Sequence, residues 1–305
     1  MSRAARVGAE DAVRELVPDV DTLAAALEAE DYLTDHGLAT ALFLAVSLPQ
    51  PLLLEGEAGV GKTEAAKTLA RVLDTPLIRL QCYEGIDSAE ALYEWNYPRQ
   101  MLGIKLAESR REPLADDELF SADYLIARPL LGALQHPGPR PAVLLIDEVD
   151  RADDEFEAFT LELLAESSVT IPELGTVRAT HPPIVILTSN RTRDVHDALR
   201  RRCLYHWIAF PPADQVAEIV RRRVPASSER LALGTAYAVS RLRELRLQKH
   251  PGIAEAVDWA AALAALGVER FEAETARMTL GSVLKYREDQ ELARDDDAWL
   301  AVGDA

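Results

Sequence analysis

A glycine-rich loop between a strand-like and a helix-like segment limits this chain to few folds. It lies in LLLEGEAGVGKTEAAKTLARVL, residues 52–73, where the glycines and the Lys-Thr pair have the spacing G-x-x-x-x-G-K-T. Such glycines let the backbone curl so that successive N–H groups point inward at phosphate oxygens, and the following helix presents its positive end. An apolar strand before the loop and a helix after it are the context that this motif requires. The segment therefore predicts an α/β fold that binds a nucleoside triphosphate.

The loop also assigns roles to single residues. Lys62 supplies positive charge to the phosphates, and the Thr63 hydroxyl is expected to bind a Mg²⁺ ion that bridges the outer phosphates. A chance glycine-rich turn and a dinucleotide-binding loop are the alternatives, but the third glycine of the dinucleotide fingerprint is missing. ATP and Mg²⁺ are therefore the predicted cofactors. The residues expected to contact the nucleotide are Gly56, Glu57, Ala58, Gly59, Val60, Gly61, Lys62, Thr63 and Glu64.

Four continuous apolar runs end in polar or glycine residues, which is typical of parallel strands buried on both faces. Between the last two runs, residues 153–167 show helical spacing and residues 168–179 indicate a hairpin. After about residue 210 the strand patterns stop and helical patterns take over. The predicted strands lie in residues 51–56, 75–82, 141–148 and 182–190, and the later helices in residues 234–245, 256–267 and 279–296.

These patterns predict two domains. Residues 1–210 are expected to form an α/β nucleotide-binding domain with a parallel sheet and an N-terminal helical segment, and residues 211–305 a smaller all-α lid domain. The most apolar stretch, residues 37–54, is interrupted by Ser47 and by Pro49-Gln50-Pro51. It therefore predicts a buried helix, a turn and a strand rather than a membrane span.

Charge and cysteine content exclude several classes of protein. The chain has 33 Lys and Arg against 51 Asp and Glu, a net charge of -18, so its summed field repels nucleic acid and anionic membranes. Cys82 and Cys203 lie far apart and lack the spacing of a disulfide framework or a zinc site. The first residues are charged throughout, without the apolar core of a signal peptide. We expect a cytoplasmic protein with no nucleic-acid partner and no stable membrane insertion.

A pair of carboxylates ends the third apolar run. Asp147 is expected to hold Mg²⁺ through its water shell, and Glu148 to orient or deprotonate the water that attacks the γ-phosphate. A solvated turn is the alternative for this pair taken alone, and the preceding phosphate loop argues against it. Asn190 ends the next run, where its amide is expected to position the attacking water or contact the γ-phosphate. Taken alone, Asn190 would also suit an ordinary turn.

Together these motifs resemble those of AAA+ ATPases, and the stretches around them resemble the MoxR family. Within that family the chain is most similar to the branch that includes CoxD, which is associated with maturation of the molybdenum-copper carbon monoxide dehydrogenase. The resemblance covers residues 33–288 and implies a five-stranded parallel core with a helical lid, a homo-oligomeric ring, usually a hexamer, and ATP hydrolysis between subunits. It also implies chaperone-like remodelling of a metalloenzyme client, together with a von Willebrand factor A-domain protein. The stretches that carry it are YEGID, YEWNYPRQM, LFSADYLIARPLL, LLIDEVDRADDEFEAF, VTIPELGTVRA, TSNRTRDVHDALRRRCLYHW and PGIAEAVDWA.

Three consecutive arginines, Arg200, Arg201 and Arg202, follow the Asn190 run after one short helix. Three interpretations compete: a nucleic-acid patch, a solvated helix end, and an arginine finger that reaches the nucleotide of a neighbouring subunit. The net charge argues against the first, and the position matches that of the finger in AAA+ proteins. We expect Arg201 or Arg202 to be the finger, because a cation there stabilises the charge that develops on the transferred phosphoryl group.

One position departs from the family pattern. The lids of AAA+ proteins usually carry an arginine at the start of a helix, but here Ile253 stands at the aligned position, with Lys249 and His250 as the nearby basic residues. The departure puts the coupling of the γ-phosphate to lid movement in question, though not the ATPase chemistry. Two functions stand beside an ATP-hydrolysing remodelling chaperone. One is a nucleic-acid-dependent motor or loader, since LRRRC also resembles the arginine-finger motif of clamp loaders, and the other, which the missing arginine favours, is a nucleotide-gated binding module with little hydrolysis.

Overall fold

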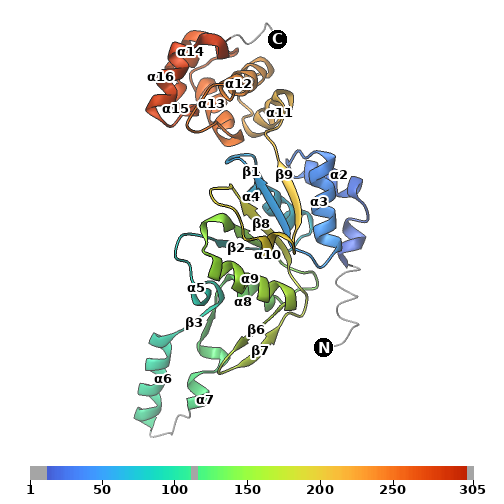
Figure 1. Ribbon diagram of the computed structural model, residues 1–305, viewed down its shortest axis with the longest axis vertical. Coiled ribbons are helices and arrows are strands. Elements are labelled where there is room, and N and C mark those ends of the chain that lie inside the picture. The colour runs from blue at the N-terminus through green and yellow to red at the C-terminus, as the bar shows by residue number, and fades with distance from the viewer. Residues whose placement is uncertain (1–11, 111–115, 301–305) are drawn as a thin grey trace. The chain divides into compact units, whose positions relative to one another are not determined.

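The chain folds as two units, and the glycine-rich loop is grouped with the second. The computed structural model describes residues 12–110 and 116–300 (Figure 1). The first unit takes in Met1–Glu55 and Thr63–Trp207, and the second takes in Gly56–Lys62 and Ile208–Ala305. The contacts of the loop thus assign it to the second unit, which is helical. Most of the strand before the loop and most of the helix after it belong to the first unit.

A five-stranded sheet organises the first unit. Its strands are β1 Leu52–Gly56, β2 Leu77–Gln81, β5 Val143–Asp147, β8 Ile184–Ser189 and β9 Leu204–Ile208. Their order is β2-β5-β8-β1-β9, and the β2–β5, β5–β8 and β8–β1 pairs are parallel. In the register Gln81 pairs with Asp147, and Glu55 pairs with Ser189, so polar side chains gather where these strands end. The predicted α/β fold with a parallel sheet and a following helical region is confirmed.

Burial separates inner strands from an edge strand. Every residue of β1, β5 and β8 is buried, whereas Leu80 alone is buried in β2. The prediction that all four apolar runs are buried on both faces is therefore wrong for β2. This strand is at the edge of the sheet, where α8 Pro129–Leu134 packs against it and Arg79 stays exposed.

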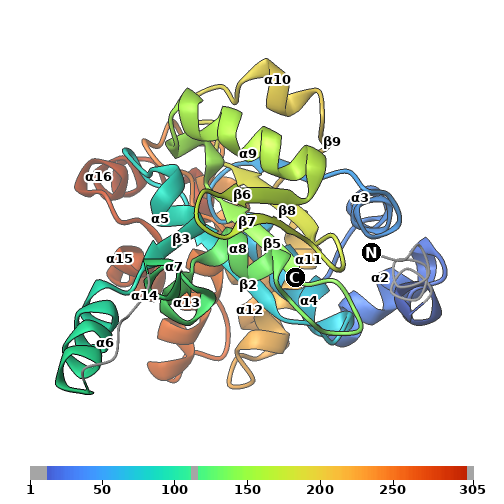
Figure 2. The same cartoon turned by 90° about the horizontal axis from the view of Figure 1, so that it is seen from below.

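The helices of the first unit follow the apolar patterns. The stretch of residues 37–54 forms α3 His36–Ser47, a turn and β1, as predicted. None of the helices in the described ranges is both long and apolar enough to cross a membrane. The predicted helix of residues 153–167 is α9 Asp154–Glu166, which lies beside α10 Asp197–Arg200 (Figure 2). Two further helices of the first unit are α2 Val20–Ala29 and α4 Lys62–Val72.

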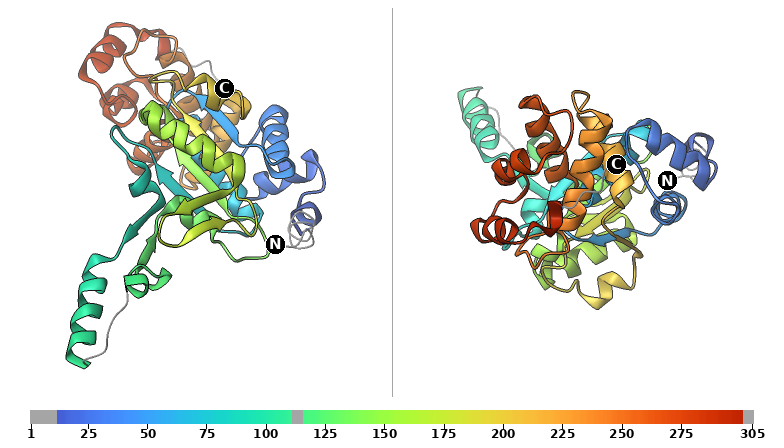
Figure 3. Two further views of the ribbon diagram at one scale, coloured as in Figure 1. Left: turned by 60° about the horizontal axis from the view of Figure 1, so that its bottom comes forward. Right: turned by 90° about the horizontal axis from the view of Figure 1, so that it is seen from above.

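Two antiparallel strand pairs lie outside the five-stranded sheet. The elements concerned are α5 Ser88–Leu92, β3 Tyr93–Trp95, α6 Tyr97–Arg110, α7 Asp116–Leu119, η1 Ala122–Tyr124, β4 Leu125–Ala127, β6 Ser168–Ile171 and β7 Gly175–Arg178. The antiparallel pair β3–β4 leads to α6, which extends away from the sheet (Figures 1 and 3). Trp95, at the end of β3, is buried and packs edge-on against Phe120, with 5.2 Å between ring centroids. The β6–β7 pair is antiparallel, which confirms the hairpin predicted for residues 168–179.

The second unit consists of helices around two buried tryptophans. Its elements are α11 Ala213–Arg223, α12 Glu229–Leu242, α13 Ile253–Ala265, α14 Ala273–Met278, α15 Leu280–Val283, α16 Arg287–Asp295 and η3 Asp297–Leu300. Trp259 and Trp299 are fully buried, with ring centroids 6.0 Å apart, and Trp259 Nε1 donates to Thr279 Oγ1 at 2.7 Å. The helices predicted in residues 234–245 and 256–267 are α12 and α13.

The prediction of one helix over residues 279–296 is wrong. The chain leaves helical geometry at Leu284, with φ −110° and ψ 119°, and α16 begins at Arg287. Leu284 is buried in the core of the second unit, so the break inserts an apolar side chain that a continuous helix would direct elsewhere. Gln290 Nε2 donates to the carbonyl oxygen of Leu284 at 2.9 Å and replaces a helical hydrogen bond there.

Candidate nucleotide-binding site

The loop between β1 and α4 curls around the amino group of Lys62. This side chain is buried, and its Nζ donates to the carbonyl oxygens of Gly56 and Glu57 at 2.8 and 2.7 Å. Gly59 and Gly61 have φ values of +81° and +97°, a region that residues with a Cβ rarely adopt, so this backbone path requires glycine. A curled loop that leads into an 11-residue helix can present several N–H groups to an anion.

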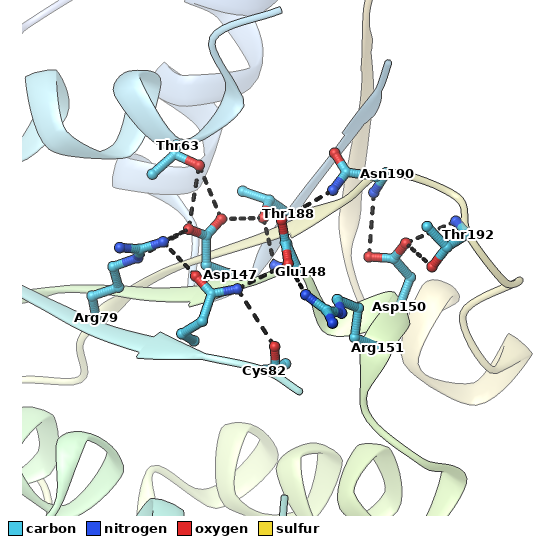
Figure 4. A network of polar contacts seen from close by, with 11 residues as sticks. Thr63, Arg79, Cys82, Asp147, Glu148, Asp150, Arg151, Thr188, Asn190 and Thr192 are labelled. Carbon is cyan, nitrogen blue, oxygen red and sulfur yellow. Dashed lines mark hydrogen bonds and ion pairs between the residues drawn. The ribbon is translucent and has the colours of Figure 1, made fainter. Parts of the chain in front are cut away.

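Thr63, in the first turn of α4, reaches the carboxylate that ends β5 (Figure 4). Its Oγ1 donates to Asp147, at 3.0 Å from Oδ1 and 3.3 Å from Oδ2. Thr188 Oγ1 donates to the same Oδ1 at 2.6 Å. Asp147 is 2% exposed, so both of its oxygens depend on protein partners. The structure thus brings together the two residues that the sequence predicts at the metal.

The oxygen donors of this pair fit Mg²⁺. One hydroxyl and one carboxylate suit an ion that keeps several waters and takes further oxygens from phosphates. Within residues 12–110 and 116–300, no group of three or more His, Cys, Asp or Glu side chains is arranged to hold a metal ion. Magnesium at Thr63 and Asp147 would therefore depend on oxygens that the nucleotide brings.

Glu148, the residue after Asp147, has a left-handed backbone conformation, with φ +56° and ψ 50°. Its backbone N–H donates to Thr188 Oγ1 at 2.9 Å. Gln81 Nε2 and Arg151 Nη1 donate to its Oε2 at 3.0 and 3.1 Å, and Asn190 Nδ2 donates to its Oε1 at 3.3 Å (Figure 4). A non-glycine residue in this backbone region often marks a functional position, and here three donors fix the direction of the carboxylate.

Asn190 is held in place by a buried carboxylate. Its backbone N–H donates to Asp150 Oδ1 at 3.2 Å, and the N–H and hydroxyl of Thr192 donate to Asp150 Oδ2 at 2.8 and 2.7 Å. Asp150 is buried and lies in the short helix η2 Val149–Arg151, directly after Glu148. It fixes the loop after β8, so the Asn190 amide points at Glu148 (Figure 4).

The first arginine of the run has a structural partner. Arg200 Nη2 donates to Glu55 Oε1 at 2.8 Å, and the Tyr205 hydroxyl donates to Glu55 Oε2 at 3.0 Å. Glu55 is 0% exposed, and a buried carboxylate of this kind needs a cationic partner. Arg200 therefore ties the end of α10 to β1.

The other two arginines of the run lie at the surface. The Arg201 side chain is 81% exposed, and its ion pair with Asp197, at 3.3 Å, is an exposed contact of the kind that contributes little to stability. Arg202 is also exposed, and its Nη1 lies 3.5 Å from the carbonyl oxygen of Leu161. The three consecutive arginines thus divide into one structural residue and two solvent-exposed ones.

Sequence reasoning missed two residues on β2. Arg79 Nε and Nη2 donate to Asp147 Oδ2 at 2.9 and 2.6 Å, and Gln81 donates to Glu148 as described. Both positions interrupt an apolar strand at a spacing of two, which places them on the same face. That alternation was the available signal, because polar residues on one face of an otherwise apolar strand need polar neighbours.

Cys82 lies directly after β2 at the border of this cluster. Burial, followed by the charge of Asp147, raises the pKa of its thiol to about 12. The thiol is therefore neutral at physiological pH and is not a nucleophile. Its carbonyl oxygen accepts a bond from Gln81 Nε2 at 3.4 Å.

The second unit holds the loop through the start of α13. Ile253, at the position expected for the lid arginine, donates its backbone N–H to the carbonyl oxygen of Gly59 at 2.9 Å. Arg243 packs its guanidinium 3.9 Å from the ring centroid of Phe210, and its Nε donates to the carbonyl oxygen of Pro251 at 2.7 Å. Burial lowers the pKa of Arg243 to about 10, so it keeps its charge at neutral pH. At the position where we expected an arginine side chain, Ile253 thus contacts the loop through its backbone N–H.

Known proteins share the sequence pattern of this site. The sequence profile described as "AAA domain (dynein-related subfamily)" matches residues 51–203, which include the loop, both carboxylates and Asn190. An uncharacterized protein of Staphylococcus aureus strain USA300 is 26% identical over 195 residues, which are 61% of this chain and 64% of that protein. The chain thus spans less than two thirds of the length of this curated relative.

Two solved structures of a Thermotoga maritima protein are similar to the chain. The RuvB Holliday junction branch migration motor is 16% identical, with 83% of this chain and 67% of that chain covered and a TM-score of 0.45. A point mutant of RuvB is 16% identical, with 88% and 71% covered and a TM-score of 0.48. Since the family profile matches half of the 305 residues, the chain belongs to the AAA domain family, in its dynein-related subfamily.

Proposed function

We propose that this protein hydrolyses ATP with the loop of residues 56–63 and the carboxylates of Asp147 and Glu148. The carrying observation is that Thr63 Oγ1 lies 3.0 Å from Asp147 Oδ1, although the two residues are 84 positions apart in the sequence. Lys62 and the backbone N–H groups of the loop hold the phosphates, and Thr63 and Asp147 hold Mg²⁺. When bound, this ion neutralises charge that develops on the outer phosphates.

Glu148 is the general base in this proposal. Its carboxylate takes a proton from the attacking water as the water oxygen bonds to the γ-phosphorus, and ADP leaves with the electron pair of the broken P–O bond. Gln81 and Arg151 both bond to Oε2, so Oε1 is the oxygen that receives the proton. Asn190, 3.3 Å from Oε1, orients the water.

Arg201, with Arg202 beside it, is the proposed finger that acts on the nucleotide of a neighbouring subunit in a homo-oligomeric ring, expected to be a hexamer. Exposure of the Arg201 side chain supports this role, since a finger must be free to contact another chain. Arg200 is assigned to the fold instead, because it neutralises buried Glu55. A cation supplied from a neighbour makes hydrolysis depend on assembly.

Hydrolysis drives remodelling of a partner protein in this proposal. The resemblance to the MoxR family supports a chaperone that matures a metalloenzyme, of which the molybdenum-copper carbon monoxide dehydrogenase is the example from the CoxD branch. A von Willebrand factor A-domain protein is the expected co-partner. The net charge of -18 and the use of Arg200 inside the fold argue against a nucleic-acid-dependent motor.

The test is Glu148→Gln, with Glu155→Gln on the exposed side of α9 as the matched control. We expect Glu148→Gln to lower steady-state phosphate release at least about 100-fold, because a general base contributes about that factor or more. Binding of a fluorescent ATP analogue should stay within about threefold of the parent, since the phosphate loop is unchanged. The control should behave as the parent in both assays.

Turnover of Glu148→Gln near the parent rate would show that the assigned base is wrong. Single-turnover hydrolysis at high protein concentration separates the proposal from a nucleotide-gated binding module. The proposal expects one ATP per site to be hydrolysed by the parent, whereas the binding module would leave the nucleotide intact.

A further inference from the structure

We infer that Arg79 is an internal counter-cation of Asp147, which holds the carboxylate before the metal arrives and competes with Mg²⁺ for it. The inference rests on the proposed function, since it concerns the carboxylate assigned to the metal. Its basis is the pair of bonds from Arg79 Nε and Nη2 to Asp147 Oδ2, at 2.9 and 2.6 Å (Figure 4). Charge-assisted bonds of this length are the strong kind.

The partners of Asp147 divide between its two oxygens. Oδ1 accepts from the hydroxyls of Thr63 and Thr188 at 3.0 and 2.6 Å, and these donors are neutral. Oδ2 accepts from the Arg79 guanidinium, which supplies the positive charge. A carboxylate that is 2% exposed has lost most of its water, and a neighbouring positive charge offsets that loss. Arg79 therefore neutralises Asp147, as a cation bound in the nucleotide site would.

Arg79 is placed so that it can leave. Its side chain is 48% exposed, against 3% for that of Asp147, and it stands on the edge strand β2. A guanidinium at the surface regains water when the ion pair opens, whereas the buried carboxylate has no such compensation. The cost of separation falls on Asp147 and is offset only when another cation replaces Arg79. Mg²⁺ and Arg79 are thus alternatives at this carboxylate.

The same arginine is linked to the base. Arg79 Nη2 also donates to Gln81 Oε1, and Gln81 Nε2 donates to Glu148 Oε2 at 3.0 Å. Movement of Arg79 away from Asp147 therefore removes a bond that fixes the Gln81 amide, which in turn holds Glu148. Glu148 would keep its bonds from Arg151 and Asn190, so the carboxylate assigned to the metal and the base share one of the three contacts that hold the base.

The experiment uses Arg79→Gln and Arg79→Lys, with Arg128→Gln as a control for loss of a surface ion pair, that of Arg128 with Glu94. Binding of a fluorescent ADP analogue to the full chain is measured in EDTA and across a Mg²⁺ titration. We expect the half-saturating Mg²⁺ concentration of Arg79→Gln to fall about fivefold, since a half-exposed ion pair is worth about 1 kcal/mol. The half-saturating Mg²⁺ concentration of Arg79→Lys should lie between those of the parent and Arg79→Gln. Binding of the ADP analogue in EDTA should be the same for all of them.

Two outcomes would overturn the inference. An unchanged Mg²⁺ requirement would show that Arg79 does not compete, and weaker binding both in EDTA and in Mg²⁺ would make Arg79 a ligand of the nucleotide instead. A parent protein that does not bind nucleotide at all would contradict the proposed function, so the two failures are distinct.

Thermal unfolding without nucleotide covers the case of a poorly folded variant. Arg79→Gln should lower the melting temperature because Asp147 is left without its cation, and adding Asp147→Asn should restore most of the loss. A loss of the same size in both backgrounds would show that the pairing with Asp147 is not the reason, and would count against the inference.

Discussion

Two buried carboxylates, Glu55 of β1 and Asp147 of β5, illustrate different uses of the same chemistry. Both are nearly inaccessible to solvent, and each accepts bonds from an arginine and from a hydroxyl group. For Glu55 these partners are Arg200 and Tyr205, which flank the start of β9, so the carboxylate joins two neighbouring parts of the sheet. For Asp147 one partner is Thr63, the residue that follows the phosphate loop.

Burial alone does not distinguish Asp147, the residue assigned to the metal, from Glu55, because both carboxylates are buried. The elements that their partners come from do distinguish them. Glu55 is paired with Arg200 and Tyr205, and Arg191 Nε lies 4.0 Å from its Oε2, but it has no contact with the phosphate-loop helix among the hydrogen bonds of the described residues. Asp147 connects the loop helix, β2 and β8 through Thr63, Arg79 and Thr188. A residue that links several elements at the strand ends is placed to respond to a ligand there.

The largest expected effect is that of Asp147→Asn on turnover. In the proposed mechanism this carboxylate holds Mg²⁺, so its loss should lower phosphate release at least about 100-fold at saturating ATP. The free energy of unfolding should change little, because Arg79 is half-exposed and can return to water. Steady-state phosphate release and urea unfolding check the two parts. Turnover near the parent rate would place Asp147 with Glu55 among structural carboxylates.

A smaller effect is expected when the arginines of the run are compared. Arg200→Met should lower the free energy of unfolding by about 2 kcal/mol, because it leaves Glu55 buried without its main cation. Arg201→Met should change it by less than about 0.5 kcal/mol, since its ion pair is exposed. Urea denaturation of the two matched variants gives both values. Equal losses would mean that the arginines do not have separate roles in the fold.

Much of this site could be predicted because its pattern is local. Gly56 to Thr63 are eight consecutive residues whose spacing alone determines the loop, and Asp147 and Glu148 follow an apolar run that has to be a strand. Asn190 follows a second such run. Parallel strands place their carboxyl ends at one edge of the sheet, so the meeting of Thr63 with Asp147 follows from fold and motif together.

The partners of these residues could not be predicted in the same way. Arg200 and Glu55 are 145 positions apart, and three consecutive arginines have the same local pattern, so the direction of each depends on how α10 ends. Arg79 pairs with Asp147 because β2 is next to β5, and strand order is not written in the strand itself. The break at Leu284 likewise arises from burial in the second unit, which overrides local helical spacing.

The most direct measurement is a mixing experiment with two inactive subunits. One carries Arg201→Met and Arg202→Met and keeps Glu148, and the other carries Glu148→Gln and keeps both arginines. If the finger acts on a neighbouring subunit, an equal mixture should regain about a quarter of the parent turnover, the share of interfaces that random assembly completes. Phosphate release that stays at the level of the separate variants would contradict an arginine supplied in trans.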